Sequence, residues 1–65
     1  MLQPLVAVST DVREFDSYTW HAVPRQYIEA AVAGAGVFPV LVPSIGDRLD
    51  LDQLLDSVDG VMVTG

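Results

Sequence analysis

DGVMVTG, residues 59–65, is the stretch that decides the fold of this 65-residue chain. Its centre, Val61-Met62-Val63, is an uninterrupted apolar run with two β-branched members and a glycine near each end. Such a run is typical of a central strand in a parallel sheet, covered on both faces. Ligands of open α/β sheets bind beyond the carboxyl ends of central strands, which here means Thr64 and Gly65.

Two earlier stretches also have the composition of strands. Leu5–Val8 is short and apolar and follows Pro4, which suits the start of a strand because proline has no amide hydrogen for the ladder. Phe38–Val42 is the second stretch. Its Pro39 removes a ladder donor, so we expect this strand at an edge of the sheet.

Two stretches have the apolar spacing of helices. Residues 24–35 place their apolar side chains on one face, with the proline in the first turn, and Gly36 suits the left-handed residue that ends a helix. Residues 51–58 carry apolar side chains at i, i+3, i+4 and i+7. Asp50, with Gln53 three residues later, resembles a capping box that starts this second helix.

The order strand, helix, strand, helix, strand predicts an α/β fold with parallel strands and right-handed crossovers. We expect the strand at 5–8 between the strands at 38–42 and 61–63, which is the order 2-1-3, with one helix on each face. The carboxyl ends that would face a ligand are then Ser9-Thr10-Asp11 and Thr64-Gly65.

This sheet is expected to be incomplete. One helix per face cannot cover three strands, and the outer edge of the strand at 61–63 would expose unpaired amides. Apolar residues make up 51% of the sequence against 18% charged, which fits a core larger than 65 residues can close. We therefore expect residues 1–65 to be the N-terminal part of a single domain, with the remainder supplied by a longer protein or a companion chain.

Composition also limits the partners and the compartment. A net charge of −6 repels nucleic acid and anionic membranes, so we expect neither as a partner. No apolar run approaches the roughly 20 residues that cross a bilayer. The N-terminus, Met1-Leu2-Gln3-Pro4, lacks the basic and apolar regions of a signal peptide, which leaves a cytoplasmic location by default.

Residues 10–23 form a polar and aromatic stretch without a clear period, which we interpret as a site-lining loop. Asp11, Tyr18 and His21 are its candidate substrate-mouth residues. For His21, the sole histidine, an ordinary loop position is favoured over substrate contact, because no cysteine and no second metal ligand accompany it. Covering the end of the sheet is likewise the favoured role for the aromatic side chains.

Other motifs predict no cofactor and no metal. Gly34-Ala35-Gly36 follows a helix and precedes a strand, whereas a phosphate-binding glycine loop requires the reverse order. Thr64-Gly65 is more promising. A glycine at the end of a central strand lets the backbone turn tightly and leaves amides free to face a developing negative charge, although a plain turn explains it equally well.

Four blocks, in this order, carry a resemblance to a known family: residues 4–9 (PLVAVS), 27–32 (YIEAAV), 35–43 (AGVFPVLVP), and 54–56 with 59–65 (LLD, DGVMVTG). Together they resemble the N-terminal part of the gamma-glutamyl-gamma-aminobutyrate hydrolases, which belong to the class I glutamine amidotransferase-like superfamily. Ala7 departs from the family, which commonly has glycine there, and we interpret it as a tolerated packing change.

The resemblance implies a flavodoxin-like α/β domain that hydrolyses gamma-glutamyl amide bonds with a cysteine nucleophile, a histidine base and an orienting glutamate. No residue of this chain matches that triad, because the chain has no cysteine and His21 lies in the wrong place. What the resemblance assigns here is an oxyanion loop beginning at Thr64-Gly65 and a substrate mouth near residues 10–23. A homodimer of the full protein stays open.

Two other classes share this opening pattern. A phosphoacceptor receiver domain needs paired acids after the first strand and an aspartate after the third, but only Asp11 fits the first requirement and Thr64 occupies the last position. A small-molecule-binding half-domain without chemistry is the other alternative. We favour the hydrolase.

Overall fold

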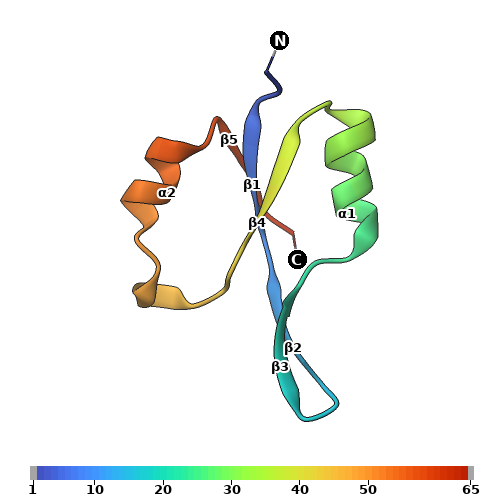
Figure 1. The fold of residues 1–65 in the computed structure, drawn as a ribbon, viewed down its shortest axis with the longest axis vertical. Helices are drawn as coiled ribbons and strands as arrows, with labels where there is room; N and C mark the ends of the chain where they lie inside the picture. The colour runs from blue at the N-terminus through green and yellow to red at the C-terminus, as the bar shows by residue number, and fades with distance from the viewer. Residues whose placement is uncertain (1, 65) are drawn as a thin grey trace.

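The computed structural model describes residues 2–64, which form two sheets, two α-helices and two short helices of other types (Figure 1). The elements in chain order are β1 (Leu5–Ser9), β2 (Asp11–Phe15), β3 (Tyr18–Ala22), α1 (Arg25–Glu29), the π-helical η1 (Ala30–Gly34), β4 (Phe38–Val42), the 3-10 turn η2 (Gly46–Arg48), α2 (Leu51–Ser57) and β5 (Gly60–Met62).

The main sheet has the order β4-β1-β5, and all its strands are parallel. β1 pairs with β4 from Leu5 to Ser9 and with β5 from Val6 to Val8. The predicted order 2-1-3 is confirmed, and Pro39 lies in an edge strand as expected. Figure 1 shows α1 and α2 on opposite sides of this sheet, so one helix covers each face.

The first helix differs in detail from its prediction. Pro24 has φ −59° and ψ 138°, so it precedes α1 as its cap and does not lie in the first turn. The helix ends in a wider turn, η1, where Ala35 N–H donates to the Ala30 carbonyl at 3.1 Å. Gly36 then adopts φ 65°, which confirms it as the left-handed residue that redirects the chain into β4.

The second helix begins as the sequence predicts. Asp50 has extended backbone angles, and its Oδ1 accepts a hydrogen bond from Gln53 N–H at 3.0 Å. This bond satisfies one of the amides that the first turn of a helix leaves unpaired. Asp52 adds a negative charge near the positive end of α2.

Residues 10–23 are not a loop, and this interpretation was wrong. β2 and β3 form an antiparallel hairpin in which Phe15 pairs with Tyr18. Asp16 and Ser17 have φ values of 53° and 68°, the positive angles of a two-residue type I′ turn, which matches the twist of the strands it joins. Trp20 Nε1 donates to the Phe15 carbonyl at 3.2 Å across the hairpin. In Figure 1 the hairpin extends beyond the end of β1.

The core of residues 2–64 is small. Its buried apolar side chains are those of Ala7, Val8 and Ala31. Val61 in β5 is 52% exposed and Val63 is 83% exposed, so the described residues do not cover the run that we expected to be covered on both faces. β5 is an edge strand of this sheet, and its place inside a larger one stays a prediction. None of the helices described within residues 2–64 has the length and apolar character to cross a bilayer.

We expect the 65-residue chain by itself to be unfolded or aggregated. Ordering a backbone costs about 1–2 kcal/mol per residue, and so few buried apolar side chains cannot offset that cost. Circular dichroism during heating, combined with sedimentation analysis, measures this. A cooperative thermal transition from a monomer of the isolated chain would contradict the expectation.

In a larger protein that contains these residues, Asp50→Ala is expected to lower the free energy of unfolding by about 1 kcal/mol, because it removes the cap of α2. Asp50→Asn keeps a side-chain acceptor and is the matched control, with an expected change of a few tenths of a kcal/mol at most. Urea denaturation measures both variants, and equal stabilities for alanine and asparagine would contradict the capping role.

Candidate functional site

The carboxyl ends of β1, β4 and β5 meet at one edge of the sheet, where three hydroxyl side chains join them. Thr64 N–H donates to Ser9 Oγ at 2.8 Å, and Thr64 Oγ1 donates to the Ser9 carbonyl at 3.0 Å. On the other side of β1, Thr10 Oγ1 donates to the Val42 carbonyl at 2.6 Å. We call Ser9, Thr10 and Thr64 the hydroxyl clasp.

The hydroxyl clasp begins where the β1–β5 ladder stops. The last residues in register between these strands are Val8 and Met62. Thr10 and Thr64 are buried, each with 8% exposure. A buried polar group without a partner costs about 1–3 kcal/mol, and within residues 2–64 every buried side-chain nitrogen or oxygen has one. Short hydroxyl side chains at the ends of parallel strands therefore continue the pairing that the backbones no longer provide.

The predicted oxyanion residues fall partly inside this arrangement. The amide of Thr64 is directed at Ser9 and already has an acceptor, so it is not free to face a ligand. Gly65 lies outside the described residues. A backbone donor for a developing negative charge would have to come from the chain after Thr64, and the predicted role of this turn stays a prediction.

The three substrate-mouth candidates lie on the hairpin, but they are not together. Asp11 begins β2 beside the clasp, and its carboxylate lies 3.7 Å from the guanidinium of Arg13. His21 pairs with Val12 near the base of the hairpin. Tyr18 lies next to the turn at the far end, with 69% exposure. The hairpin therefore keeps Asp11 and His21 near the sheet edge and carries Tyr18 away from it.

His21 makes a contact that the sequence did not indicate. Its Nδ1 accepts a hydrogen bond from Ser44 N–H at 3.0 Å. An imidazole nitrogen that accepts a hydrogen bond uses its lone pair to do so, and that lone pair is then not available to a substrate or a metal ion. The bond fastens the base of the hairpin to the chain that follows β4. It satisfies a backbone amide, which agrees with the ordinary structural role favoured for this histidine.

One hollow of the described residues lies near the clasp. A cavity of about 230 Å³ beneath α2 is lined by Ser9 and Thr10 together with mostly apolar side chains, among them Leu54 and Val61. Its lining offers few polar groups, so we interpret it as space for further packing. Within residues 2–64 no group of three acidic or histidine side chains could hold a metal ion.

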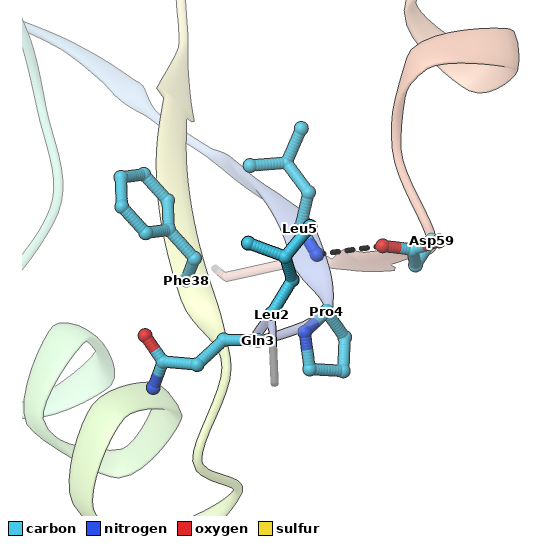
Figure 2. A pocket seen from close by; sticks show the side chains of 6 residues that line it. All are labelled: Leu2, Gln3, Pro4, Leu5, Phe38 and Asp59. Atoms are coloured by element: carbon cyan, nitrogen blue, oxygen red, sulfur yellow. Dashed lines mark hydrogen bonds between the residues drawn. The ribbon is translucent and has the colours of Figure 1, made fainter.

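A larger hollow, of about 830 Å³, lies at the opposite end of the sheet, around the start of β1 (Figure 2). Figure 2 shows the Asp59 carboxylate directed at the backbone of Leu5, whose N–H donates to Asp59 Oδ2 at 2.7 Å. Asp59 N–H donates in turn to the Leu5 carbonyl at 2.7 Å. Asp59 thus fastens the start of β5 to β1, a structural role that no pattern in the sequence indicates.

Comparison with known proteins adds two findings. The sequence matches the Peptidase C26 family over residues 4–65. It is also 28% identical, over 69 aligned residues, to a glutamine amidotransferase-like protein of Rickettsia prowazekii (strain Madrid E). That alignment covers 97% of this chain and 24% of the relative, so the chain spans about a quarter of the length of that protein.

The contact between His21 and Ser44 predicts a local effect on amide exchange. In a larger protein containing these residues, His21→Ala should speed hydrogen exchange at the Ser44 amide, because the acceptor is lost. His21→Asn is the matched variant, since its Oδ1 can replace Nδ1 as acceptor. Amide exchange followed by NMR measures the difference, and equal protection of Ser44 in all three proteins would show that the bond does not hold the hairpin.

Proposed function

The chain belongs to the Peptidase C26 family, and from that premise we propose that it is the N-terminal part of a hydrolase that cleaves gamma-glutamyl amide bonds. The observation that carries the proposal is the family match over residues 4–65, in a chain whose strand ends gather at one edge of a parallel sheet. The relative's description as glutamine amidotransferase-like supports the same chemistry, because glutamine is itself a gamma-amide of glutamate.

The proposed reaction uses a cysteine thiolate from the remainder of the domain. The sulfur attacks the gamma-carbonyl carbon and forms a C–S bond, and the carbonyl oxygen takes the negative charge. The C–N bond then breaks, and a histidine gives its proton to the departing amine. Water next attacks the thioester, which releases glutamate and restores the thiol. Neither the nucleophile nor the base is assigned to this chain, since it has no cysteine and His21 Nδ1 is bonded to Ser44.

The contribution proposed for residues 1–65 is a backbone cradle. Thr64 and Gly65 begin the loop that would supply an oxyanion donor, and removal of one such donor typically slows an enzyme about 10²–10³-fold. Asp11 and His21, near the edge of the sheet, are proposed to border the substrate mouth. Tyr18 could join them only through the outer end of the hairpin, which lies farther from the clasp.

We further propose that the remainder of the domain completes a flavodoxin-like sheet on the open edge of β5. The chain spans about a quarter of its relative, and large apolar side chains on η1, α2 and β5 are exposed. Leu51, Leu55 and Val61 are each about half exposed and form surface that a larger core would cover. No cofactor, metal or nucleic acid takes part in this proposal.

The contacts of Thr64 make a phosphoacceptor receiver domain a weaker alternative than the hydrolase. The position that would have to carry a phosphate-accepting aspartate holds a threonine whose hydroxyl donates to the Ser9 carbonyl. A module that only binds a small molecule would share the fold and lack turnover. The assay that follows separates both alternatives from the hydrolase.

Incubating the full-length protein with glutamine, gamma-glutamyl-gamma-aminobutyrate and a gamma-glutamyl anilide is expected to release the free amine and glutamate from at least one of them. Substitution of the nucleophilic cysteine by alanine should lower the rate by about 10⁴-fold or more, because the covalent route is lost. Liquid chromatography of the products measures the release.

Arg25→Ala is the matched control for this assay. Arg25 forms an exposed ion pair with Glu29 on α1, at 3.2 Å, and such pairs contribute at most about 1 kcal/mol to stability. Its turnover should equal that of the wild type. A folded wild-type protein that cleaves none of the three compounds, or a cysteine variant that still turns over, would contradict the proposed hydrolase.

A further inference from the structure

We propose that one face of the β2–β3 hairpin binds the amine half of the substrate, and that this half is an aromatic amino acid. Trp20 would stack on its ring, and Arg13 would pair with its carboxylate. This inference rests on the proposed hydrolase and deepens it, because it names the part of the substrate that leaves with the amide nitrogen.

The strand register places three aromatic side chains and one guanidinium on the same face of the hairpin. Arg13 lies opposite Trp20 and Phe15 lies opposite Tyr18, and residues two apart along a strand point to the same side. We call these four residues the aromatic face. Trp20 is 50% exposed, and its Nε1 donates to the Phe15 carbonyl, which holds the indole on the hairpin. A shallow hollow of about 310 Å³ is lined by Tyr18, Thr19 and Trp20.

The hairpin stands at the edge of the sheet where ligands of parallel α/β folds bind. β2 begins at Asp11, directly after the end of β1, and the hairpin continues outward from there (Figure 1). His21 belongs to the other face and is bonded to Ser44 after β4, so the aromatic face is directed away from that segment. At about 3.3 Å per residue, Arg13 and Trp20 lie about 7 Å along the hairpin from its base. An amine half whose amide lies at the strand ends would reach them.

The chemistry of this face indicates which amine half it fits. The chain has nine acidic residues and three arginines, and one of these arginines, Arg25, is paired with Glu29 at 3.2 Å. Arg13 lies 3.7 Å from the Asp11 carboxylate, which is longer than a charge-assisted hydrogen bond, and its side chain is 60% exposed. Its guanidinium can therefore take a carboxylate from a ligand.

The spacing of the pair favours a ligand that carries both groups. The Cβ atoms of directly opposed residues such as Arg13 and Trp20 are about 5 Å apart, which is similar to the separation of ring and carboxylate in phenylalanine or tyrosine. A ring stacked on the indole would place the carboxylate beside the guanidinium. An aromatic amino acid matches this face better than ammonia or an aliphatic amine does.

Turnover of matched substrates by the full-length protein tests this inference. The ratio of kcat/KM for gamma-glutamyl-phenylalanine to that for gamma-glutamyl-glycine should be about 10 or more. Trp20→Ala should lower this ratio about tenfold, because the stacking surface is lost, and Trp20→Phe should keep most of it. Arg13→Gln should lower the ratio of gamma-glutamyl-phenylalanine to gamma-glutamyl-phenethylamide, which lacks the carboxylate, also about tenfold. Glu14→Gln, on the opposite face, is the matched control and should change neither ratio.

Two results of these experiments would overturn the role of the aromatic face. An equal loss with every substrate in Trp20→Ala would place the damage in the fold of the hairpin. A dimer in sedimentation that dissociates in Trp20→Ala would show that a second copy of the protein covers this face.

A binding measurement keeps the inference separate from the proposed function. Calorimetry on a full-length variant with alanine in place of the nucleophilic cysteine should show gamma-glutamyl-phenylalanine binding about tenfold more tightly than gamma-glutamyl-glycine. Trp20→Ala should remove the difference. A protein with this binding preference and no turnover would overturn the hydrolase alone. Turnover without any preference between the two substrates would overturn the role of the aromatic face alone.

Discussion

The pairing of β1 with a parallel neighbour on each side is the constraint on which the other features depend. Because β4 and β5 run in the same direction as β1, their carboxyl ends must lie at one edge. The crossovers then place α1 and α2 on opposite faces (Figure 1), and the parallel order brings together the residues that follow each strand. At this edge hydroxyl groups replace the backbone ladder, with Ser9 holding Thr64 and Thr10 holding Val42. At the other end Asp59 holds Leu5 in the same way.

These attachments matter because packing contributes little within the described residues. The buried apolar side chains are small, and α2 exposes leucine side chains that would normally face a core. The hydrogen bonds at the two ends of β1 therefore add to the backbone ladder that fixes the register of the strands. A larger domain would add the missing packing. In the proposed enzyme, this chain would supply the backbone that forms the cradle, and the remainder of the domain would supply the reactive side chains. Family membership and the relative's greater length both agree with that division.

The strand order and the helix cap could be predicted because each depends on local or topological rules. Pro39 excluded a central place for β4, and Asp50 lies where a cap must lie. The hairpin could not be recognised as readily, since its turn is Asp16-Ser17 and lacks the glycine that usually supplies positive φ. The signal was present in Tyr18, Thr19 and Trp20, a run of aromatic and β-branched residues that starts after a two-residue gap from the short stretch Asp11–Phe15.

For the site, the sequence predicted which strand ends lie together, so Ser9 and Thr64 were expected at the same end of the sheet. The bonds from Ser44 to His21 and from Leu5 to Asp59 join residues far apart in sequence, and no periodic pattern reports such contacts.

The most direct test of the account is a crystal structure of the full-length protein with a gamma-glutamyl aldehyde bound to its nucleophilic cysteine as a tetrahedral adduct. The account predicts that the adduct's oxygen lies about 3 Å from a backbone nitrogen in the residues just after Thr64. It also predicts that the Thr64 amide stays bonded to Ser9 Oγ in the complex. An adduct whose oxygen is bound only by groups on other strands, with the chain after Thr64 turned away, would contradict the account.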